Sequence, residues 1–583
     1  MELNVNDGKK MRVTDIVLVI FIGLVLFAPS LFVRDLWTPD EPRYMEVARE
    51  MASTGNYLVP HLNGYLYPDK PPLFFWLAAG LYKTGFGLKS GRIVSGTAAL
   101  ITALIVLVFA SRKIGRNGAL IVSAMTMTSI LFMEAKAGVI DPLLMLFSTA
   151  CVLSGYTALQ PSTSRRAAWW MACYSLAGIA ILTKGPVALL PPLLALVPYA
   201  ILNRRNLASG VRVHGMGIVV LLAIALSWFI PMTMAAGPEY REHVVRQIFG
   251  RVVNSYSHRA PFYYYIKMAP LNFFPWFLLL IPALAWAARS WRRSGNDFGL
   301  FAFLWFALSF IAFSIISGKR QGYLMPILPA AGLMMGAYMN SVATREFSWP
   351  RLHDWLARIT LAIFILISVA AVAIYLSLTK TIVSYVRGAG NFTAEIAKFE
   401  RPSVLAIILI LAVIFSALAA TGIAISRRNR WLPFFTIVAI MVLASFICDV
   451  CLAPQINRFK SPRNFTDGIH STLAHASGIY ILKNDMDGVY NVYTKINHMR
   501  ELRSTDEILR VLALGEKAAI ITNNRNRRRL IGDDFAGCLA IFKSAGVGSD
   551  QMELLINWNP ETGNLLGPPP CEFQTVPDAP KRR

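Results

Sequence analysis

Long apolar runs constrain the fold of this chain more than any other feature. The first extends from Ile16 to Phe32, directly after the basic stretch Lys9-Lys10-Met11-Arg12. No small-x-small cleavage site follows it, so we interpret it as a membrane helix with a cytoplasmic N-terminus rather than a signal peptide. Further runs of spanning length fall near residues 92–110, 119–133, 142–159, 168–182, 186–202, 214–236, 273–290, 298–316, 324–341, 359–378, 403–425 and 432–452. We therefore predict a polytopic α-helical membrane protein with about 13 transmembrane helices.

The composition supports this class of protein. Of the 583 residues, 55% are hydrophobic and 15% are charged, whereas soluble domains carry about 25% charged residues. This excludes an ordinary cytosolic enzyme, and the high hydrophobicity excludes a disordered chain. The formal net charge is +24. In a membrane protein such basic residues mark cytoplasmic loops, so we expect no nucleic-acid partner.

The positive-inside rule decides how the ambiguous apolar segment 71–88 is placed. If this segment lies in the membrane interface without crossing, every short arginine cluster falls in a cytoplasmic loop. These clusters are Arg112/Lys113/Arg116, Arg165/Arg166, Arg204/Arg205, Arg289/Arg292/Arg293, Arg345/Arg351/Arg358 and Arg427/Arg428/Arg430. A crossing at 71–88 would place all of them outside. Residues 34–91 are therefore predicted to form a long external loop with interfacial helices.

The chain divides by composition into a membrane domain, residues 1–452, and a polar external domain, residues 453–583. The second part is long enough for a small α/β domain, and its runs Gly478-Ile-Tyr-Ile-Leu and Lys517-Ala-Ala-Ile-Ile-Thr predict strands. It contains Cys538 and Cys571, which an oxidising compartment would allow to pair; the sequence leaves the pairing open. Cys448 and Cys451 lack the strand–helix context of a redox motif, so packing is the favoured interpretation.

Acidic and basic residues gather at the predicted outer face, first in Trp37-Thr-Pro-Asp-Glu-Pro-Arg-Tyr. Helix capping would explain one carboxylate near a helix N-terminus. It does not explain Asp40, Glu41 and Arg43 together at membrane level, where charge is expensive and usually functional. The second group, Tyr67-Pro-Asp-Lys-Pro-Pro, fixes Asp69 and Lys70 between prolines. A rigid lysine at headgroup depth suits a lipid phosphate, and simple snorkelling is the alternative.

Three further groups lie in predicted external loops. Glu134, Lys136 and Asp141 occupy a very short loop, where Asp141 would be an N-cap in the simplest interpretation. Lys184 and the segment Gly318-Lys-Arg-Gln-Gly-Tyr form cationic hairpins on the outer side, which favours an anionic ligand. The loop 237–272 contains His243, Arg246, Arg251, His258 and Arg259. With Asp69 or Glu41, its two histidines could supply a metal site, although their spacing is not that of a tight motif such as H-E-x-x-H.

Together these groups suit an anionic lipid headgroup above the hydrocarbon. No glycine-rich loop that would cradle the phosphates of a nucleotide is present. An external enzyme without ATP must use a preactivated donor that a lipid carries.

The motifs resemble the membrane GT-C glycosyltransferases, in particular the protein O-mannosyltransferase-like group. Within that group Val59-Pro-His-Leu-Asn-Gly, Leu182-Thr-Lys-Gly-Pro and His258-Arg-Ala-Pro-Phe-Tyr-Tyr-Tyr are most similar to the lipid A aminoarabinose transferases. The resemblance covers roughly residues 14–330. It implies thirteen spans with a periplasmic domain, in the bacterial inner membrane. It also implies transfer of 4-amino-4-deoxy-L-arabinose from undecaprenyl phosphate to lipid A phosphates, and with it polymyxin resistance.

Carried over residue by residue, the resemblance makes Asp40 and Asp141 the essential acids, with Glu41 beside them. The residues expected to bind the carrier phosphate are Arg43, Lys70, Tyr67, Arg259 and Tyr323. The ligands of a divalent metal (Zn²⁺, Mg²⁺ or Mn²⁺) would be Asp69, His243 and His258; relatives often have the longer Glu at the Asp69 position.

Two other functions compete with an inverting lipid-dependent transferase of aminoarabinose. A relative acting on another polyprenyl-phosphate sugar, or on a protein acceptor, would share the motifs. A transporter or flippase for an anionic lipid belongs to another class. Transporters often show internal repeats and charges at mid-membrane, whereas this chain shows no repeat and its acids lie at the ends of spans. The oligomeric state is left open.

Overall fold

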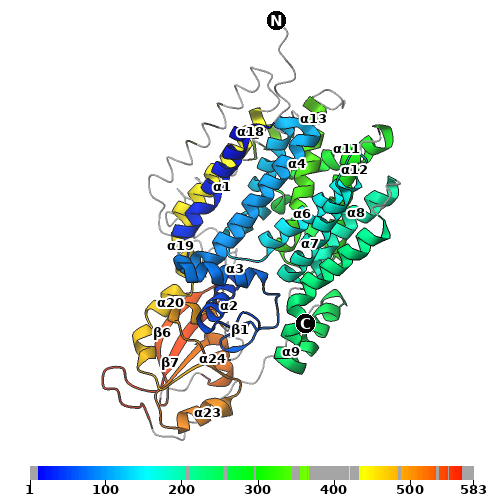
Figure 1. Cartoon of the computed structure of the whole chain (residues 1–583). Coiled ribbons are helices and arrows are strands. Elements are labelled where there is room, and N and C mark those ends of the chain that lie inside the picture. The colour runs from blue at the N-terminus through cyan, green and yellow to red at the C-terminus, as the bar shows by residue number, and fades with distance from the viewer. Residues whose placement is uncertain are drawn as a thin grey trace. The chain divides into compact units, whose positions relative to one another are not determined.

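The computed structural model describes residues 11–343 apart from 204–209, 254–258 and 295–296, isolated positions between 355 and 419, and residues 432–567 apart from 483–487, 533–536 and 549. The chain divides into two compact units. The helical unit comprises residues 1–33, 68–74 and 92–453, and the sheet unit comprises residues 34–67, 75–91 and 454–583. Figure 1 shows the ribbon coloured along the chain.

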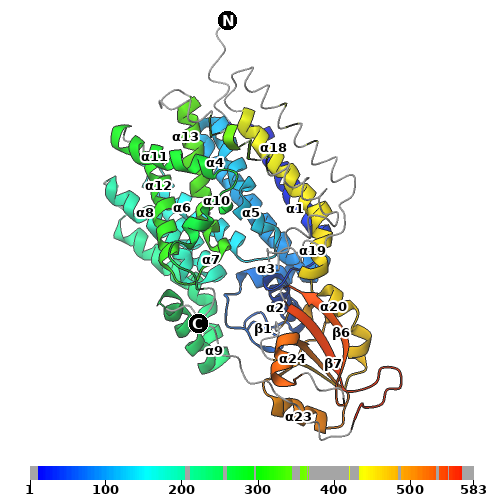
Figure 2. The same ribbon diagram turned by 180° about the vertical axis from the view of Figure 1, so that it is seen from behind.

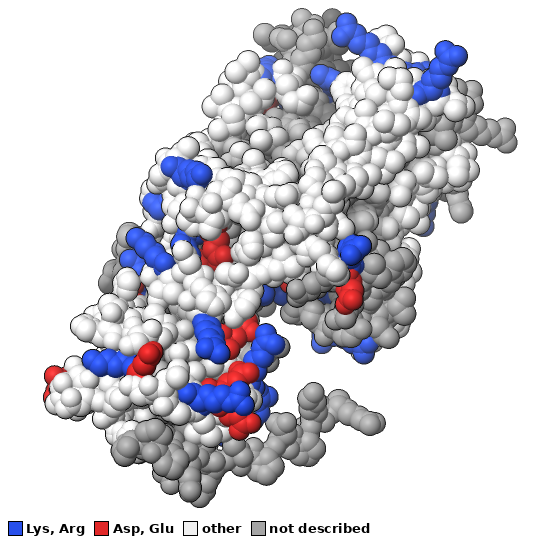
Figure 3. Space-filling model, turned by 60° about the horizontal axis from the view of Figure 1, so that its bottom comes forward, with Lys and Arg blue, Asp and Glu red and all other residues white. Residues whose placement is uncertain are grey.

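Long apolar helices make up the helical unit. Within the described residues, seven helices are long and apolar enough to cross a membrane, or eight if the bent pair α10 (Tyr264–Asn272) and α11 (Phe277–Ser294) is one span. The other main helices are α1 (Val13–Val33), α4 (Ser90–Thr128), α6 (Asp141–Leu159), α7 (Arg166–Lys184), α8 (Leu190–Leu202), α9 (Val211–Val253), α12 (Asp297–Ile315), α13 (Leu328–Ala343) and α18 (Leu432–Ile447). On the face that Figure 3 shows, the surface of this unit carries few charged side chains. That suits contact with lipid.

Helices lie at the positions of the predicted spans. Those at predicted spans 168–182 and 186–202, α7 and α8, are not among the seven or eight that are long and apolar enough to cross a membrane. Predicted spans 92–110 and 119–133 are joined in α4, which is broken where Gly115 has a φ of 74°. Glycine adopts this left-handed conformation without steric penalty, so the two halves of α4 are separate rods. Predicted spans 359–378 and 403–425 lie outside the continuously described residues, and the count of thirteen stays a prediction.

The ambiguous segment 71–88 contains the helix α3 (Leu73–Leu81), which has nine residues. At 1.5 Å per residue it is about half as long as a membrane-spanning helix must be. A π-helical turn, η1 (Tyr82–Phe86), follows it and ends at glycines of positive φ. The prediction that this segment does not cross the membrane agrees with these lengths.

A five-stranded mixed sheet forms the centre of the sheet unit. Its order is β4 (Arg500–Leu502), β3 (Gly478–Leu482), β5 (Ala518–Asn523), β7 (Asp550–Ile556) and β6 (Ala540–Val547). The first three strands are parallel, and β7 pairs antiparallel with both β5 and β6. Figure 2 shows β6 and β7 side by side from behind. The helices α20 (Arg463–Asp467) and α21 (His470–Ala474) cover one face, and α23 (Thr505–Ala513) covers the other. The strands predicted from alternating residues are confirmed.

The sheet unit also contains most of the first predicted loop. The helix α2 (Asp40–Thr54) and the hairpin of β1 (His61–Leu62) and β2 (Tyr65–Leu66) belong to it by their contacts. For example, the indole Nε1 of Trp37 donates to Oδ1 of Asn457 at 2.8 Å. Sequence reasoning assigned residues 34–91 to the membrane domain, because pairing across more than four hundred residues leaves no local pattern.

Cysteine usage separates the two units. Cys538 of the sheet unit is disulfide-bonded, while its expected partner, Cys571, lies outside the described residues. Cys151, Cys173, Cys448 and Cys451 are free. The latter two lie on the π-helical turn η6 (Cys448–Leu452) that follows α18.

Candidate active site

In the helical unit, Asp141 and Lys184 form an ion pair. Asp141 is the first residue of α6, and Lys184 is the last residue of α7. The N-cap position of α6 is occupied by Ile140, with no side-chain cap. The simplest interpretation of Asp141, an N-cap, is therefore wrong: its carboxylate pairs with a lysine 43 residues away.

Tyr323 completes this group. It lies on the 3₁₀ turn η5 (Gln321–Ile327), and the ammonium of Lys184 sits 3.9 Å from the centroid of its ring. Such a cation–π contact holds a lysine without neutralising it. The side chains of Lys184 and Asp141 stay 11% and 18% exposed, so the pair is accessible. We call Asp141, Lys184 and Tyr323 the Asp141 cluster.

The backbone of Gly322 lies against two carboxylates. A Cβ placed on Gly322 would lie 2.5 Å from Oε2 of Glu134 and 3.4 Å from Oδ2 of Asp141. A contact of 2.5 Å is far inside van der Waals distance, so only glycine fits without moving Glu134. Glu134 starts the turn η3 (Glu134–Lys136). Both acids of the predicted 134–141 group thus face one point beside Tyr323.

Two other predicted cations are held by the protein itself. Lys319 is 5% exposed, and its ammonium donates to the carbonyl oxygens of Ala260 at 3.0 Å and Ile316 at 2.5 Å. Lys136 is buried and pairs with Asp449. The expectation that Lys319 faces an anion is not supported by these contacts, because its donors point to backbone oxygens.

Arg259 is exposed and lies in an antiparallel bridge with Gly318. The hydroxyl of Tyr265 donates to the carbonyl of Arg320 at 2.9 Å. These contacts tie the segment after residue 258 to the turn that carries Tyr323. Asp69 and Lys70, also in the helical unit, are half-buried just before α3.

In the sheet unit, α2 carries Asp40, Glu41 and Arg43. Pro39 is the N-cap residue and makes no side-chain cap. Glu41 is buried, and its Oε2 accepts from the backbone N–H of Trp37 at 2.9 Å and from Nη2 of Arg34 at 3.4 Å. These contacts favour a structural role for Glu41, while Asp40 is half-buried at the helix start.

Arg43 has the feature expected of an anion-binding residue. Its Nε is buried and has no hydrogen-bond partner among the described residues. A buried donor without an acceptor is costly, and a phosphate oxygen would satisfy it. Tyr67, at the end of the hairpin, is 5% exposed and packs edge-on against Phe75 with ring centroids 6.0 Å apart.

The predicted metal site is not tested by these residues. Within the part of the chain that the structure describes, no three His, Cys, Asp or Glu side chains are grouped to hold a metal ion. His258 and the side chain of His243 lie outside the described residues. Asp69 is the one member of the predicted set with a described side chain.

Sequence reasoning missed a buried network on α2 that consists of Glu46, Arg49 and Glu50, with 0%, 6% and 4% exposure. A signal was present: the three charges follow at i, i+3 and i+4, on one helix face, between Val47, Ala48 and Met51. Such a pattern is usually a solvated surface, and only the fold shows that it is covered.

A bundle of apolar helices with a separate mixed-sheet unit, and with acids and cations at helix ends, defines a polytopic membrane protein of the GT-C fold. The fold agrees with the crystal structure of ArnT from Cupriavidus metallidurans bound to undecaprenyl phosphate. The TM-score is 0.74 at 20% identity, covering 96% of this chain and 100% of that one. Residues 69–229 match the family model described as dolichyl-phosphate-mannose-protein mannosyltransferase.

Curated relatives specify the family. An undecaprenyl phosphate-alpha-4-amino-4-deoxy-L-arabinose arabinosyl transferase of Shewanella sediminis is 30% identical over 414 residues, 69% of this chain and 70% of the relative. The relatives of the same name in Serratia proteamaculans and Proteus mirabilis are 32% and 31% identical, and the match spans 58% and 65% of their lengths. The chain belongs to this arabinosyl transferase family.

Proposed function

We propose that the protein transfers 4-amino-4-deoxy-L-arabinose from undecaprenyl phosphate to the phosphate groups of lipid A. Family membership supports the donor, and the observation that carries the proposal is the Asp141 cluster. It offers one carboxylate and one ammonium at an accessible position. This suits a substrate with a cationic sugar and an anionic leaving group.

The chemistry follows from these charges. The bond between the anomeric carbon and the carrier phosphate oxygen breaks, and a bond to an acceptor phosphate oxygen forms with inversion. The second pKa of a phosphate is about 6, so the acceptor is ionised at neutral pH and needs no strong general base. The departing carrier phosphate needs cations that stabilise its charge, and Lys184 in the helical unit is suited to this.

Asp141 has a different role in this proposal. The donor's 4-ammonium group competes with Lys184 for the Asp141 carboxylate and releases the lysine toward phosphate. Tyr323 retains the released ammonium on its ring face. Asp40 is proposed as the second essential acid. The residues proposed from the family resemblance to bind carrier phosphate are Arg43, Lys70, Tyr67, Arg259 and Tyr323.

We place the reaction at the periplasmic face of the bacterial inner membrane. The disulfide of Cys538 supports an oxidising compartment for the sheet unit, and the arginine clusters support the opposite side for the short loops. A divalent metal would be held by Asp69, His243 and His258, and the transfer proposed here does not use it.

The test is mass spectrometry of lipid A from cells with the gene, without it, and complemented by wild type or Lys184→Met. We expect the aminoarabinose mass increment, and survival on polymyxin, only with the wild-type gene. An unchanged lipid A with a modified protein or another glycan would instead assign the acceptor to the protein-mannosyltransferase type. Accumulated unmodified carrier lipid on one leaflet would indicate a flippase.

A further inference from the structure

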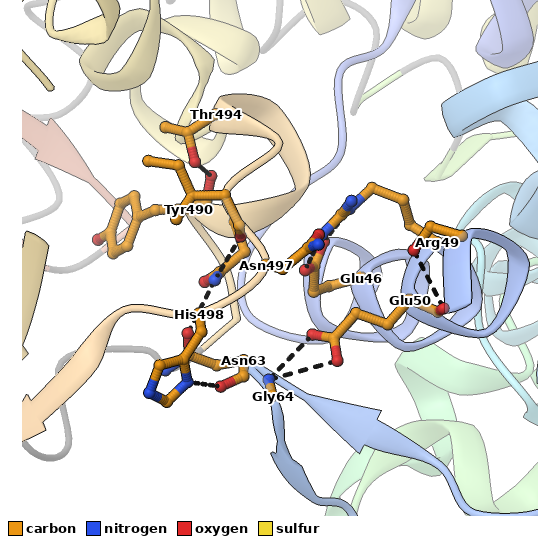
Figure 4. Close-up of polar contacts among 12 residues, drawn as sticks. Glu46, Arg49, Glu50, Asn63, Gly64, Tyr490, Thr494, Asn497 and His498 are labelled. Atoms are coloured by element: carbon orange, nitrogen blue, oxygen red, sulfur yellow. Dashed lines mark hydrogen bonds and ion pairs between the residues drawn. The ribbon is translucent and has the colours of Figure 1, made fainter. Parts of the chain in front are cut away.

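The buried network of α2 contains two carboxylates and one guanidinium. Arg49 donates from Nε to Oε2 of Glu46 at 2.8 Å and from Nη2 to Oε1 of Glu46 at 2.6 Å. Its Nη2 also donates to Oδ1 of Asn497 at 2.9 Å. Figure 4 shows these side chains between the α2 helix and the segment around residue 497. The side-chain hydrogen bonds of Arg49 thus go to Glu46 and Asn497, and among the described residues Glu50 forms no ion pair of its own.

Glu50 reaches the hairpin instead. Its two carboxyl oxygens lie 3.4 and 3.3 Å from the backbone N–H of Gly64, which donates to them (Figure 4). Glu46 lies one helical turn before Glu50, and the charge of its carboxylate acts on that of Glu50. With both ionised, the network would hold one uncompensated negative charge out of water, which is strongly unfavourable.

The hairpin tip is held from its other side as well. Asn63 has a φ of 56°, and its side chain acts as a strand partner for Met499. Its Nδ2 donates to the Met499 carbonyl at 2.8 Å, and its Oδ1 accepts from the Met499 N–H at 2.6 Å. His498 Nδ1 lies 2.8 Å from the Asn63 carbonyl. The hairpin is therefore fixed between Glu50 and the segment 497–499.

The two ends of this arrangement are residues of the proposed carrier-phosphate site. Arg43 lies on α2, two turns before Glu50, and Tyr67 directly follows β2. We propose that Glu50 is a positioning residue that, in its protonated form, fixes the β1–β2 hairpin to α2 and so sets Tyr67 relative to Arg43. The roles of Tyr67 and Arg43 in this inference rest on the proposed function. The hydrogen bonds and the buried charges of the network do not.

The electrostatics predict where the proton is lost. Burial, and then the charge of Glu46, raise the pKa of Glu50 to about 8. The other titratable groups around the network are Arg49 itself, Tyr82 of η1, which interacts with Arg49, and His498 across the hairpin. Tyr493 of α22 (Asn491–Thr494) accepts from the N–H of Leu36 instead. Because the folded-state pKa is raised, the stabilisation is present at low pH and is lost as the pH rises through about 8.

Glu50→Gln tests this directly, because glutamine keeps the shape and the hydrogen bonds but cannot ionise. The full-length protein in lipid nanodiscs is heated at pH 5.5, 6.5, 7.5, 8.5 and 9.5, and transfer is measured over the same range. For wild type we expect the melting temperature to fall as the pH rises toward about 8 and to level off above it, because a raised folded-state pKa costs stability only between the unfolded and folded values. We expect kcat/KM to fall between pH 7.5 and 9, as the folded protein loses the proton. About one tenth of a group with a pKa near 8 stays protonated at pH 9, so about a tenfold loss of transfer is expected. Glu50→Gln should show neither fall.

Glu46→Gln provides a second variant, since it leaves one carboxylate for Arg49 and should also remove the alkaline fall. The matched control is Glu553→Gln, which breaks the buried one-to-one pair of Glu553 with Arg527 at 2.7 Å in the same unit. It should lower the melting temperature at every pH and leave the alkaline fall intact. Parallel alkaline losses in wild type and Glu50→Gln would overturn the proposal.

The two readouts separate this inference from the proposed function. If the fall of the melting temperature with rising pH disappears in Glu50→Gln but the alkaline fall of transfer remains, the positioning role is refuted while the transferase stands. If no aminoarabinose transfer occurs at all, the proposed function fails. The melting profile then still decides whether Glu50 holds the proton.

Discussion

The Asp141 cluster and the buried network of α2 use the same chemical groups in opposite ways. Asp141 and Lys184 form a one-to-one pair that is partly exposed and carries a tyrosine ring at its cation. The α2 network has two buried carboxylates and one arginine, which pairs with only one of them. An accessible balanced pair can exchange a partner for substrate at low cost. A covered, unbalanced network cannot exchange partners with substrate, and so suits positioning and proton storage.

The largest expected loss of transfer comes from changing the partly exposed pair of Asp141 and Lys184. Asp141→Asn keeps the size and an acceptor oxygen but removes the charge that Lys184 and the sugar ammonium require. We expect transfer to fall by at least about a hundredfold, with normal expression and melting temperature. Asp40→Asn should behave in the same way, since Pro39 and not Asp40 is the N-cap. Lipid A mass spectra of complemented cells measure both.

Near wild-type modification of lipid A by Asp141→Asn would show that the charge of Asp141 is unnecessary. The Asp141 cluster would then not differ from the α2 network in exchanging a partner for substrate. Loss of the protein from the membrane would instead place Asp141 with the covered, structural pairs.

The next largest expected effect is weaker binding of undecaprenyl phosphate when Arg43 is replaced. Arg43→Ala removes a guanidinium whose Nε has no described partner, so little in the resting protein is lost. A charged hydrogen bond contributes about 1.5–3 kcal/mol, which predicts about ten- to hundredfold weaker binding of undecaprenyl phosphate. Lys70→Ala should weaken binding similarly. Titration of the purified variants with undecaprenyl phosphate measures this, and unchanged affinity in both would remove them from the phosphate site.

How far sequence reasoning reached differs between these regions for a physical reason. The length of an apolar run is enough to predict a membrane helix, and apolar residues at every second position predict a strand. The helices α1, α6, α7 and α12 and the strands β3 and β5 are local patterns of this kind, and their existence was predictable. Charged residues at the ends of apolar runs were equally visible, which is how Asp40, Asp141, Arg43 and Lys184 were identified as candidates.

The ion-pair and hydrogen-bond partners of these side chains were not predictable, because they depend on which helix ends meet in the folded protein. Lys184 was expected to face an anionic ligand, and its partner is Asp141 on the preceding helix. Lys319 was expected to do the same, but backbone oxygens hold it. The pairing of Asn63 with Met499 joins residues 436 apart, and no spacing in the sequence indicates it.

Gly322 gives a smaller effect within the Asp141 cluster. Gly322→Ala would place a methyl group 2.5 Å from Oε2 of Glu134, so Glu134 or the turn with Tyr323 must shift. A displacement of about 1 Å in a site costs up to about a hundredfold in rate; with a flexible glutamate absorbing part of it, we expect about tenfold. Gly80→Ala is the control, because nothing lies within 4 Å of that position.

Both variants should keep the wild-type melting temperature within a few degrees, with transfer lowered in Gly322→Ala alone. Full transfer by Gly322→Ala would mean that the position of Glu134 is irrelevant to the cluster.

The smallest effect is expected where charges are paired but exposed. Arg463 donates from Nη1 to Asp35 at 3.2 Å and from Nε to Asp467 at 3.3 Å, and its side chain is 55% exposed. Solvent screens such pairs, which contribute about 0–1 kcal/mol. Arg463→Ala should therefore change transfer by less than about twofold and lower the melting temperature by at most a few degrees, less so at high salt. Asp35 directly precedes the chain that enters α2, so this variant also asks whether an exposed link can position that helix. A tenfold loss of transfer would show that it does. Burial of a charged side chain would then no longer distinguish the residues that position Arg43 from those without a role in the site.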